Sequence, residues 1–168
     1  MRTARGTISV FTFKDGLLAR AAHDLALRLD RFEIALDGEN LTATLPLEAL
    51  AVIGPVERGA IRADQFDAAR RGEVERTMHA EVLHSDRHAA ARFTGKAAAT
   101  ADGFAVAGAL ELAGRSAPLS FAVRRDGDVY RARFDLQPSR WGIAPYKAML
   151  GAIKLKDNVR VELALEED

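Results

Sequence analysis

Apolar and polar residues alternate along most of the chain with a period of two, which is typical of β-strands with one buried face. Turn sequences of Asp and Gly separate several of these stretches, at 37–38, 102–103 and 126–127. Eight or nine short strands of this kind favour an antiparallel barrel or sandwich. The predicted strands are 7–13, 25–29, 32–36, 41–45, 93–99, 104–112, 119–123, 130–136 and 159–165.

The N-terminal third departs from simple alternation in several places. Residues 7–13 are apolar on both faces, so we expect this strand to lie between the core and a covering element, and an exposed edge could pair across a homodimer. The alternation slips by one residue at Asp30-Arg31, which predicts a bulge or turn. Residues 14–16 indicate a turn, and residues 17–22 are too short to assign. Residues 49–66 contain Gly54-Pro55 and are predicted to form a long connection.

One convincing helix is predicted over residues 67–83. Val74, Met78 and Val82 recur every four residues and form a narrow apolar stripe on one face. Arg71 and Glu75 are spaced for an i, i+4 ion pair. Gly72 weakens the first part of the helix by about 1 kcal/mol, which leaves a start at Gly72 open.

The segment 133–165 combines a strand, a Pro-Ser turn, the sequence Arg140-Trp141-Gly142-Ile143 and a closing strand. Pro145 and Gly151 fit the preference for proline at the start and glycine just past the end of a helix, which predicts a short helix over 145–150. Trp141 is the only tryptophan, and we expect its ring to plug one end of a barrel while its N–H finds a partner.

Length and charge limit the classes of function. A chain of 168 residues is typical of one domain. Its 24 basic residues balance 24 acidic ones, so neither nucleic acid nor an anionic membrane is favoured as a partner. The sequence contains neither an apolar stretch long enough to span a bilayer nor a signal-peptide pattern, and we expect a cytoplasmic protein.

The sequence offers little that would support catalysis or metal binding. It has no cysteine and no G-x-S-x-G motif. His23 and Asp24 are adjacent, so on a strand their side chains point to opposite faces. His84 and His88 have i, i+4 spacing but lack a third ligand. We therefore predict no enzymatic activity, no cofactor and no metal site.

The predicted strands place large apolar side chains on the inward face of the sheet. They are Phe93, Leu110, Leu112, Phe121 and Phe134. An eight-stranded barrel is about the size at which such side chains either fill the lumen or leave room for one small ligand. The residues alone leave both alternatives open.

Several motifs resemble the YceI-like family of lipocalin-like barrels. Arg140–Ile143 is similar to the family's R-x-x-F/W-G-I pattern, and Val159–Glu162 resembles its closing D-x-V-x-I/V strand. Residues 106–119 resemble the family's G-x-L-T-x-x-G-V-T-K-P-V hairpin, with Ser116-Ala117 in place of Thr-Lys. Residues 83–93 resemble the helix exit before a P-x-I-x-F strand, with alanines in place of the proline, and His23-Asp24-Leu25 resembles a G-H-D-L variant.

The resemblance implies a lipocalin-like antiparallel barrel of about eight strands, with one longer helix and a short helix before the last strand. It also implies binding of a polyisoprenoid or similar long-chain lipid in the lumen, as a carrier or storage protein. Many relatives are secreted. The residues then expected to contact the ligand are Phe93, Leu110, Leu112, Phe121, Phe134, Trp141, Ile143 and Tyr146, with Tyr146 and Lys147 near its polar head. The alternative is a filled, non-catalytic barrel that engages other proteins.

Overall fold

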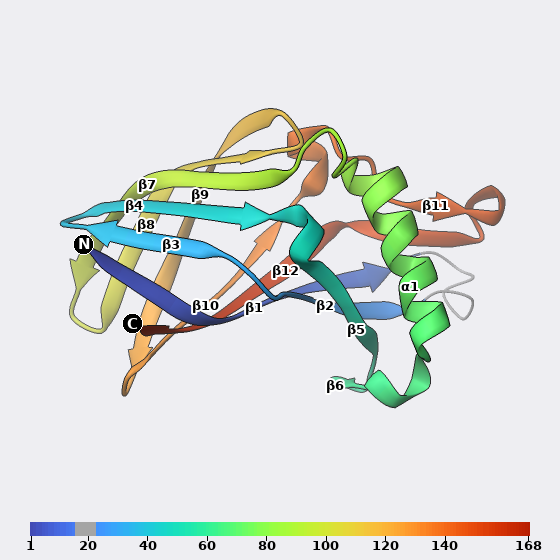
Figure 1. Cartoon of the computed structure of the whole chain (residues 1–168), viewed down its shortest axis with the longest axis horizontal. Helices are drawn as coiled ribbons and strands as arrows, with labels where there is room; N and C mark the ends of the chain where they lie inside the picture. Colours follow the sequence, from blue (N-terminus) through green and yellow to red (C-terminus); the bar gives the residue numbers. More distant parts are fainter. Residues whose placement is uncertain (16–22) are drawn as a thin grey trace.

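The computed structural model describes residues 1–15 and 23–168, and these form a closed antiparallel barrel of eight strands with one long helix across one end (Figure 1). The strands are β1 (Arg2–Lys14), β2 (Asp24–Leu29), β3 (Glu33–Asp37), β4 (Asn40–Pro46), β5 (Leu50–Glu57), β6 (Ala60–Ile61), β7 (Ala90–Thr100), β8 (Gly103–Leu112), β9 (Arg115–Asp126), β10 (Val129–Leu136), β11 (Lys147–Ala148) and β12 (Ile153–Glu167). The helix consists of α1 (Ala68–Thr77) and a π-helical turn, Met78–Leu83.

The barrel closes because β1 contacts strands from both ends of the chain. Neighbouring strands follow the order β12-β10-β9-β8-β7-β4-β3-β1, and β1 pairs again with β12. β3 reaches only the start of β1, at Arg2 and Thr3, whereas β2 pairs with Ile8–Thr12 of the same strand. β2 and β3 thus form one bent strand, interrupted at residues 30–32 where the alternation of the sequence slips.

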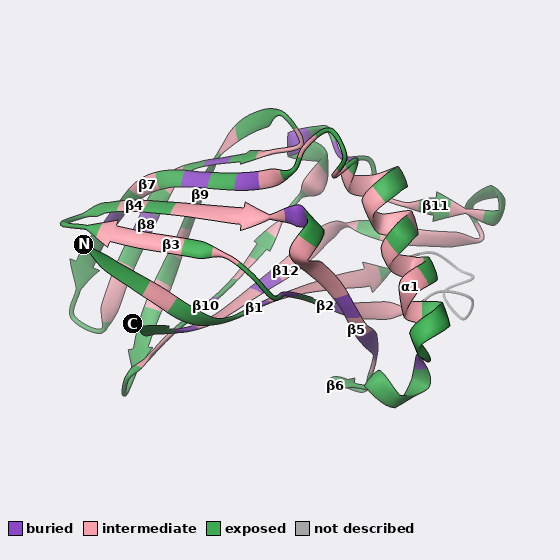
Figure 2. Ribbon diagram, in the orientation of Figure 1, coloured by how far each residue is buried: buried purple, intermediate pink, exposed green. Residues whose placement is uncertain are grey.

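The alternation of the sequence matches the burial of the strands. Figure 2 shows β7 with buried and exposed residues in turn, and Ala91, Phe93 and Ala97 are its buried positions. The three turns predicted at Asp-Gly pairs lie between β3 and β4, β7 and β8, and β9 and β10. A period of two therefore identified the strands of the barrel correctly.

The prediction of a long connection over residues 49–66 is wrong, because this region contains β5 and β6. Gly54 and Pro55 are buried within β5 rather than exposed in a loop. The ladder with β2 pairs Ala26 with Gly54 and Leu27 with Val52, so Ile53 is an extra residue that forms a bulge. A backbone irregularity of this kind accommodates Gly-Pro inside a strand.

The prediction that residues 7–13 present an exposed strand edge to a second copy is also wrong. Residues 8–12 of β1 pair with β12 on one edge and with β2 on the other. Both edges are therefore hydrogen-bonded within the chain. Of the turn predicted at residues 14–16, Gly16 lies outside the described residues, as do residues 17–22.

The long helix was predicted correctly over residues 67–83, but it does not begin at Gly72. Asp67 is its N-cap, and the Asp67 carboxylate accepts a hydrogen bond of 2.8 Å from the backbone N–H of Arg70. The predicted Arg71–Glu75 pair is replaced by other contacts: Arg71 donates to the carbonyl of Phe66, and Glu75 accepts from the backbone of Val52.

The prediction of a short helix over residues 145–150 is wrong. Two 3₁₀ turns precede or adjoin the last strand, Pro138–Trp141 and Met149–Gly151. Lys147 and Ala148 instead form β11, which pairs with Lys154 and Ile153 in a hairpin. Gly151 has a φ of +88° and supports the turn of this hairpin, so its role is to reverse the chain rather than to end a helix.

Candidate ligand-binding cavity

Two apolar cavities occupy the interior of the barrel. The larger one, of about 920 Å³, lies at the end covered by α1, and the smaller one, of about 210 Å³, lies among the aromatic residues at the other end. We call them the large cavity and the small cavity. Ile8, Leu45, Leu110, Leu136 and Val161 line both, so the two cavities adjoin at this ring of aliphatic side chains.

The large cavity is enclosed by strands on one side and by the helix on the other. β1 contributes Ile8 and Val10, and Leu25, Leu27 and Leu29 of β2 point to the same side. The apolar stripe of the helix faces these strands, and the side chains of Val74, Met78 and Val82 all line the cavity. The stripe predicted from the sequence is thus the cover of a cavity.

Polar side chains of the helix form hydrogen bonds with the backbone at the unpaired edge of β5. After β4, which pairs with β7, the chain continues into β5, which pairs with β2 on one edge. On the other edge β6 pairs only with Val56 and Glu57, so among the described residues no strand lies beside Leu50 and Val52 there. The Glu75 carboxylate accepts from the Val52 N–H at 2.8 Å, and His79 Nε2 donates to the Leu50 carbonyl at 3.1 Å. Ser85 Oγ lies 3.1 Å from the other ring nitrogen of His79. These bonds fix the helix over the cavity.

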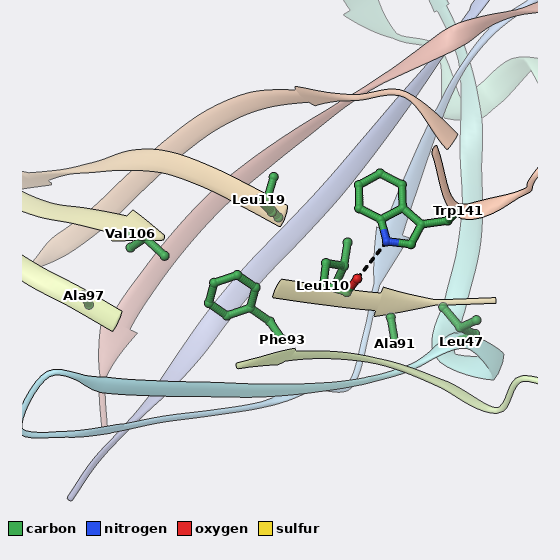
Figure 3. Packing of buried hydrophobic residues seen from close by; sticks show 8 residues of the cluster. All are labelled: Leu47, Ala91, Phe93, Ala97, Val106, Leu110, Leu119 and Trp141. Carbon is green, nitrogen blue, oxygen red and sulfur yellow. Dashed lines mark hydrogen bonds between the residues drawn. The ribbon is translucent and has the colours of Figure 1, made fainter. Parts of the chain in front are cut away.

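Trp141 lies at the boundary of the large cavity and fulfils the expectation for its N–H. Its side chain is 1% exposed, and the indole N–H donates to the backbone carbonyl of Leu110 at 2.7 Å (Figure 3). The Arg140 guanidinium lies 5.4 Å from the centre of the indole ring and also donates to the carbonyl of Pro118. The turn Pro138–Trp141 is thereby bound to the β8–β9 hairpin.

Stacked phenylalanine rings line the small cavity. The rings of Phe121 and Phe134 stack at 4.3 Å, and Phe93 lies 6.3 Å from Phe121. Gly95 and Gly108 face each other on β7 and β8, and a Cβ atom on Gly108 would lie 2.7 Å from Cζ of Phe93. The glycine pair therefore leaves the space that the Phe93 ring occupies.

The large cavity opens to solvent beside the helix. Exposed, charged residues reach its rim from α1 and β12: Asp67, Arg70, Glu73, Arg76 and Lys156. Asp157, also at the rim, accepts hydrogen bonds from the backbone N–H and the hydroxyl of Ser139. The rim carries both signs of charge around an apolar interior. Such a site suits a ligand with a long apolar part and a small polar end.

The structure places the eight residues expected to contact a ligand around these two cavities. Leu112, Trp141, Ile143 and Tyr146 line the large cavity, and Phe93, Phe121 and Phe134 line the small one, while Leu110 lines both. Their contact with a ligand remains a prediction. The leucines of β2 and the apolar stripe of the helix also line the large cavity and were not predicted to do so, although their periodicity is visible in the sequence.

The histidines considered as candidate functional residues have separate structural roles. The His23 ring packs edge-on against Phe66 at 5.9 Å, and Asp24 accepts from the backbone N–H of Lys14. His84 ends the π-helical turn in a left-handed conformation. Among the described residues, no three His, Asp or Glu side chains gather as metal ligands, and no helix is long and apolar enough to cross a membrane.

The comparisons with known proteins agree with this architecture. The model of the YceI-like domain matches residues 21–167. The chain belongs to the YceI-like family. Among solved structures, a polyisoprenoid binding domain from Saccharophagus degradans, implicated in plant cell wall breakdown, aligns with a TM-score of 0.65 and 9% identity over 99% of this chain and 97% of that one. Burkholderia cenocepacia BcnA aligns with a TM-score of 0.62 and 12% identity over 95% and 94%.

At these identities the structural matches show a common fold. No curated protein matches the chain in sequence. The family assignment and the cavities are therefore the starting point for the function.

Proposed function

We propose that this protein binds one long-chain apolar ligand, a polyisoprenoid or a similar lipid, inside the barrel and acts as a carrier or storage protein. The observation that carries the proposal is the large cavity, which offers about 920 Å³ lined mainly by Leu, Ile, Val and Met side chains. Pockets that bind small molecules commonly measure ~300–1,000 Å³ and have such apolar walls.

The small cavity supports a ligand that is long rather than compact. It continues the large cavity past Leu110 and adds about 210 Å³ between the phenylalanine rings. An engineered apolar cavity of about 150 Å³ stays dry and binds benzene. A hydrocarbon tail that reaches the small cavity would leave water at a gain of about 0.8 kcal/mol per CH₂ group.

The polar end of the ligand belongs at the rim of the large cavity. Tyr146 lines the cavity there, and Lys147 is exposed on the adjoining β11. A phenol and an ammonium group are suited to a hydroxyl or phosphate head group. The name of the Saccharophagus degradans domain, a polyisoprenoid binding domain, gives the same ligand class for a protein of this fold.

The cavities favour the binding of a ligand over a barrel filled by its own side chains. Small residues such as Gly108 and Ala132 would allow the walls of a barrel to approach each other and fill the lumen. Gly108 instead makes room for the ring of Phe93 at the small cavity, and the large cavity at the other end is open. Binding without catalysis is therefore the function we propose.

Native mass spectrometry of gently purified protein tests the proposal. We expect a species heavier than the chain by the mass of one lipid, and solvent extraction should release that lipid for identification. The bare chain as the sole species, with no lipid in the extract and none taken up from added polyisoprenoid alcohol, would contradict it.

A further inference from the structure

The tip of the β11–β12 hairpin has an unusual surface. Among the described residues, the exposed large apolar side chains are Met1, Ile61, Met149 and Leu150. Met149 and Leu150 are adjacent at this tip, with exposed fractions of 72% and 109%. Figure 2 shows the tip as exposed, at the same end of the molecule as α1. Two neighbouring apolar side chains at a projecting turn suggest a contact surface.

The backbone of the tip supports this view. Met149 and Leu150 have φ values of +51° and +56°, and Gly151 follows at +88°. Residues with a Cβ atom adopt this left-handed region at an energetic cost, so two in succession are uncommon. Strain of this kind is most often retained where a segment has a function. Here the strained turn directs two apolar side chains into solvent.

Although basic and acidic residues balance over the whole chain, lysines gather locally on the hairpin directly behind the tip. Lys147 and Lys154 are paired across β11 and β12, and Lys156 follows on the same face as Lys154. Like charges in directly opposite positions destabilise a sheet, and a partner with negative charge offsets that repulsion. Asp15 lies 3.5 Å from Lys154 and compensates one of the three charges. Apolar groups ahead of a cluster of lysines are complementary to an anionic bilayer, with its charged surface and apolar interior.

We propose that the hairpin tip, residues 147–154, inserts into an anionic phospholipid bilayer and thereby places the mouth of the large cavity at the membrane surface. Tyr146, Ile153 and Leu155 belong to the same hairpin and line that cavity, so the tip and the mouth are parts of one element. The docking rests on the exposed tip itself, whereas its use in loading or releasing a ligand rests on the proposed function.

Vesicle sedimentation with the full chain tests the docking. We expect the protein to sediment with vesicles of phosphatidylcholine and phosphatidylglycerol, and much less with phosphatidylcholine alone. Leu150→Glu should weaken binding at least tenfold, because it places a carboxylate in the bilayer. The matched control is Ile61→Glu, because Ile61 is an exposed aliphatic side chain on β6, away from the hairpin tip, and its substitution should change binding less than twofold.

The lysines give a second, independent test. Each basic residue near an anionic surface strengthens binding by about fivefold, so Lys147→Glu with Lys156→Glu should weaken it at least tenfold. Lys96→Glu, on β7 beside the β3–β4 turn, is the control and should have little effect. Added salt should weaken the binding of the wild-type protein because it screens the lysines.

A fluorescent probe locates the contact. The chain contains no cysteine, so Leu150→Cys and Ile61→Cys each give one labelling site. An environment-sensitive dye should shift to the blue with anionic vesicles at position 150 and not at position 61. A lack of sedimentation, equal binding of Leu150→Glu, or a shift at both positions would overturn the proposal.

Two further readouts separate this inference from its alternatives. If Leu150→Glu converts a dimer to a monomer in sedimentation velocity and leaves vesicle binding unchanged, the tip is a contact between copies and the proposal falls. If lipid is recovered from the purified protein while vesicles are not bound, the proposed function stands and the docking falls. We expect Leu150→Glu to retain co-purified lipid and to melt like the wild-type protein.

Discussion

The two ends of the barrel interior are built differently. At the small cavity, β7, β8 and β9 form long, continuous ladders, and stacked phenylalanine rings fill much of the space. At the large cavity, the strands diverge and the wall is completed by the helix, the turn Pro138–Trp141 and the β11–β12 hairpin. Backbone hydrogen bonds therefore hold one end, whereas side-chain contacts hold much of the other.

This difference indicates where a ligand enters. Opening the end at the small cavity would break several backbone hydrogen bonds of the sheet together. Moving the helix away from β5 breaks the bonds of Glu75 and His79 and separates a narrow apolar stripe from the strands. Local opening is easiest where few contacts must be lost. We therefore expect exchange of ligand at the large cavity.

The largest effect is expected at Trp141, in the wall of the large cavity. Trp141→Ala removes a fully buried ring and should lower the free energy of unfolding by about 3–5 kcal/mol. The carbonyl of Leu110 also loses its donor. Trp141→Ala should weaken lipid retention more than Arg140→Ala, as measured by urea unfolding and by mass spectrometry of the purified variants. Equal effects of the two substitutions would mean that Trp141 has no special relation to the ligand.

Leu110→Trp tests whether the two cavities hold one ligand. The larger side chain should block the passage to the small cavity and shorten the longest chain that the protein retains. Excluding three or four CH₂ groups weakens binding by roughly 3 kcal/mol, about a hundredfold. Ala109→Trp is the matched control, because Ala109 is exposed on the opposite face of β8. A series of fatty alcohols of increasing length measures the difference, and identical length preferences would show that the small cavity is not used.

Gly108→Ala probes the end at the small cavity alone. The added methyl group would clash with the carbonyl oxygen of Thr94 and lie 2.6 Å from Cα of Gly95 and 2.7 Å from Cζ of Phe93, and it should lower stability by about 1–3 kcal/mol through overpacking. Gly72→Ala in α1 is the contrasting control and should be neutral or stabilising by up to about 1 kcal/mol, because alanine favours the helix. Thermal unfolding monitored by circular dichroism compares them. A neutral Gly108→Ala would mean that both the backbone of β7 and the Phe93 ring move aside without cost.

Glu75→Ala probes the end at the large cavity and should have the smallest effect on global stability, about 1–2 kcal/mol. Its effect should be local, since the Val52 N–H loses its acceptor at the edge of β5. Hydrogen exchange at Val52 should accelerate while exchange in β8 does not change. Glu81→Ala, on the exposed side of the π-helical turn, is the control. Uniform acceleration throughout the barrel would contradict a separately opening helix.

Much of the barrel was predictable because its strands have one buried face, which imposes a period of two. Phe93, Leu110 and Phe134 were placed in the interior on that basis, and the stripe Val74, Met78 and Val82 identified the helix. β5 was missed because Gly54-Pro55 normally ends a strand. Here a bulge at Ile53 and burial against Ala63 accommodate the pair, and these are tertiary contacts.

The cavity itself could not be predicted from the sequence. Whether apolar side chains fill a lumen or line it depends on how far the strands diverge and on where the helix docks. Docking depends on the contacts of Glu75 and His79 with β5, which join residues 23 and 29 positions apart. Residues 145–150 were predicted to form a helix because Pro145 and Gly151 fit helix ends, whereas the pairing of β11 with β12 makes residues 147–154 a hairpin.

A crystal structure of the protein purified with its lipid, or soaked with a polyisoprenoid alcohol, tests the central claim most directly. We predict continuous electron density for one chain that begins at the rim near Tyr146, passes Trp141 and Leu110, and ends between Phe93, Phe121 and Phe134. Density confined to the outer surface, or two cavities containing only ordered water, would contradict the account.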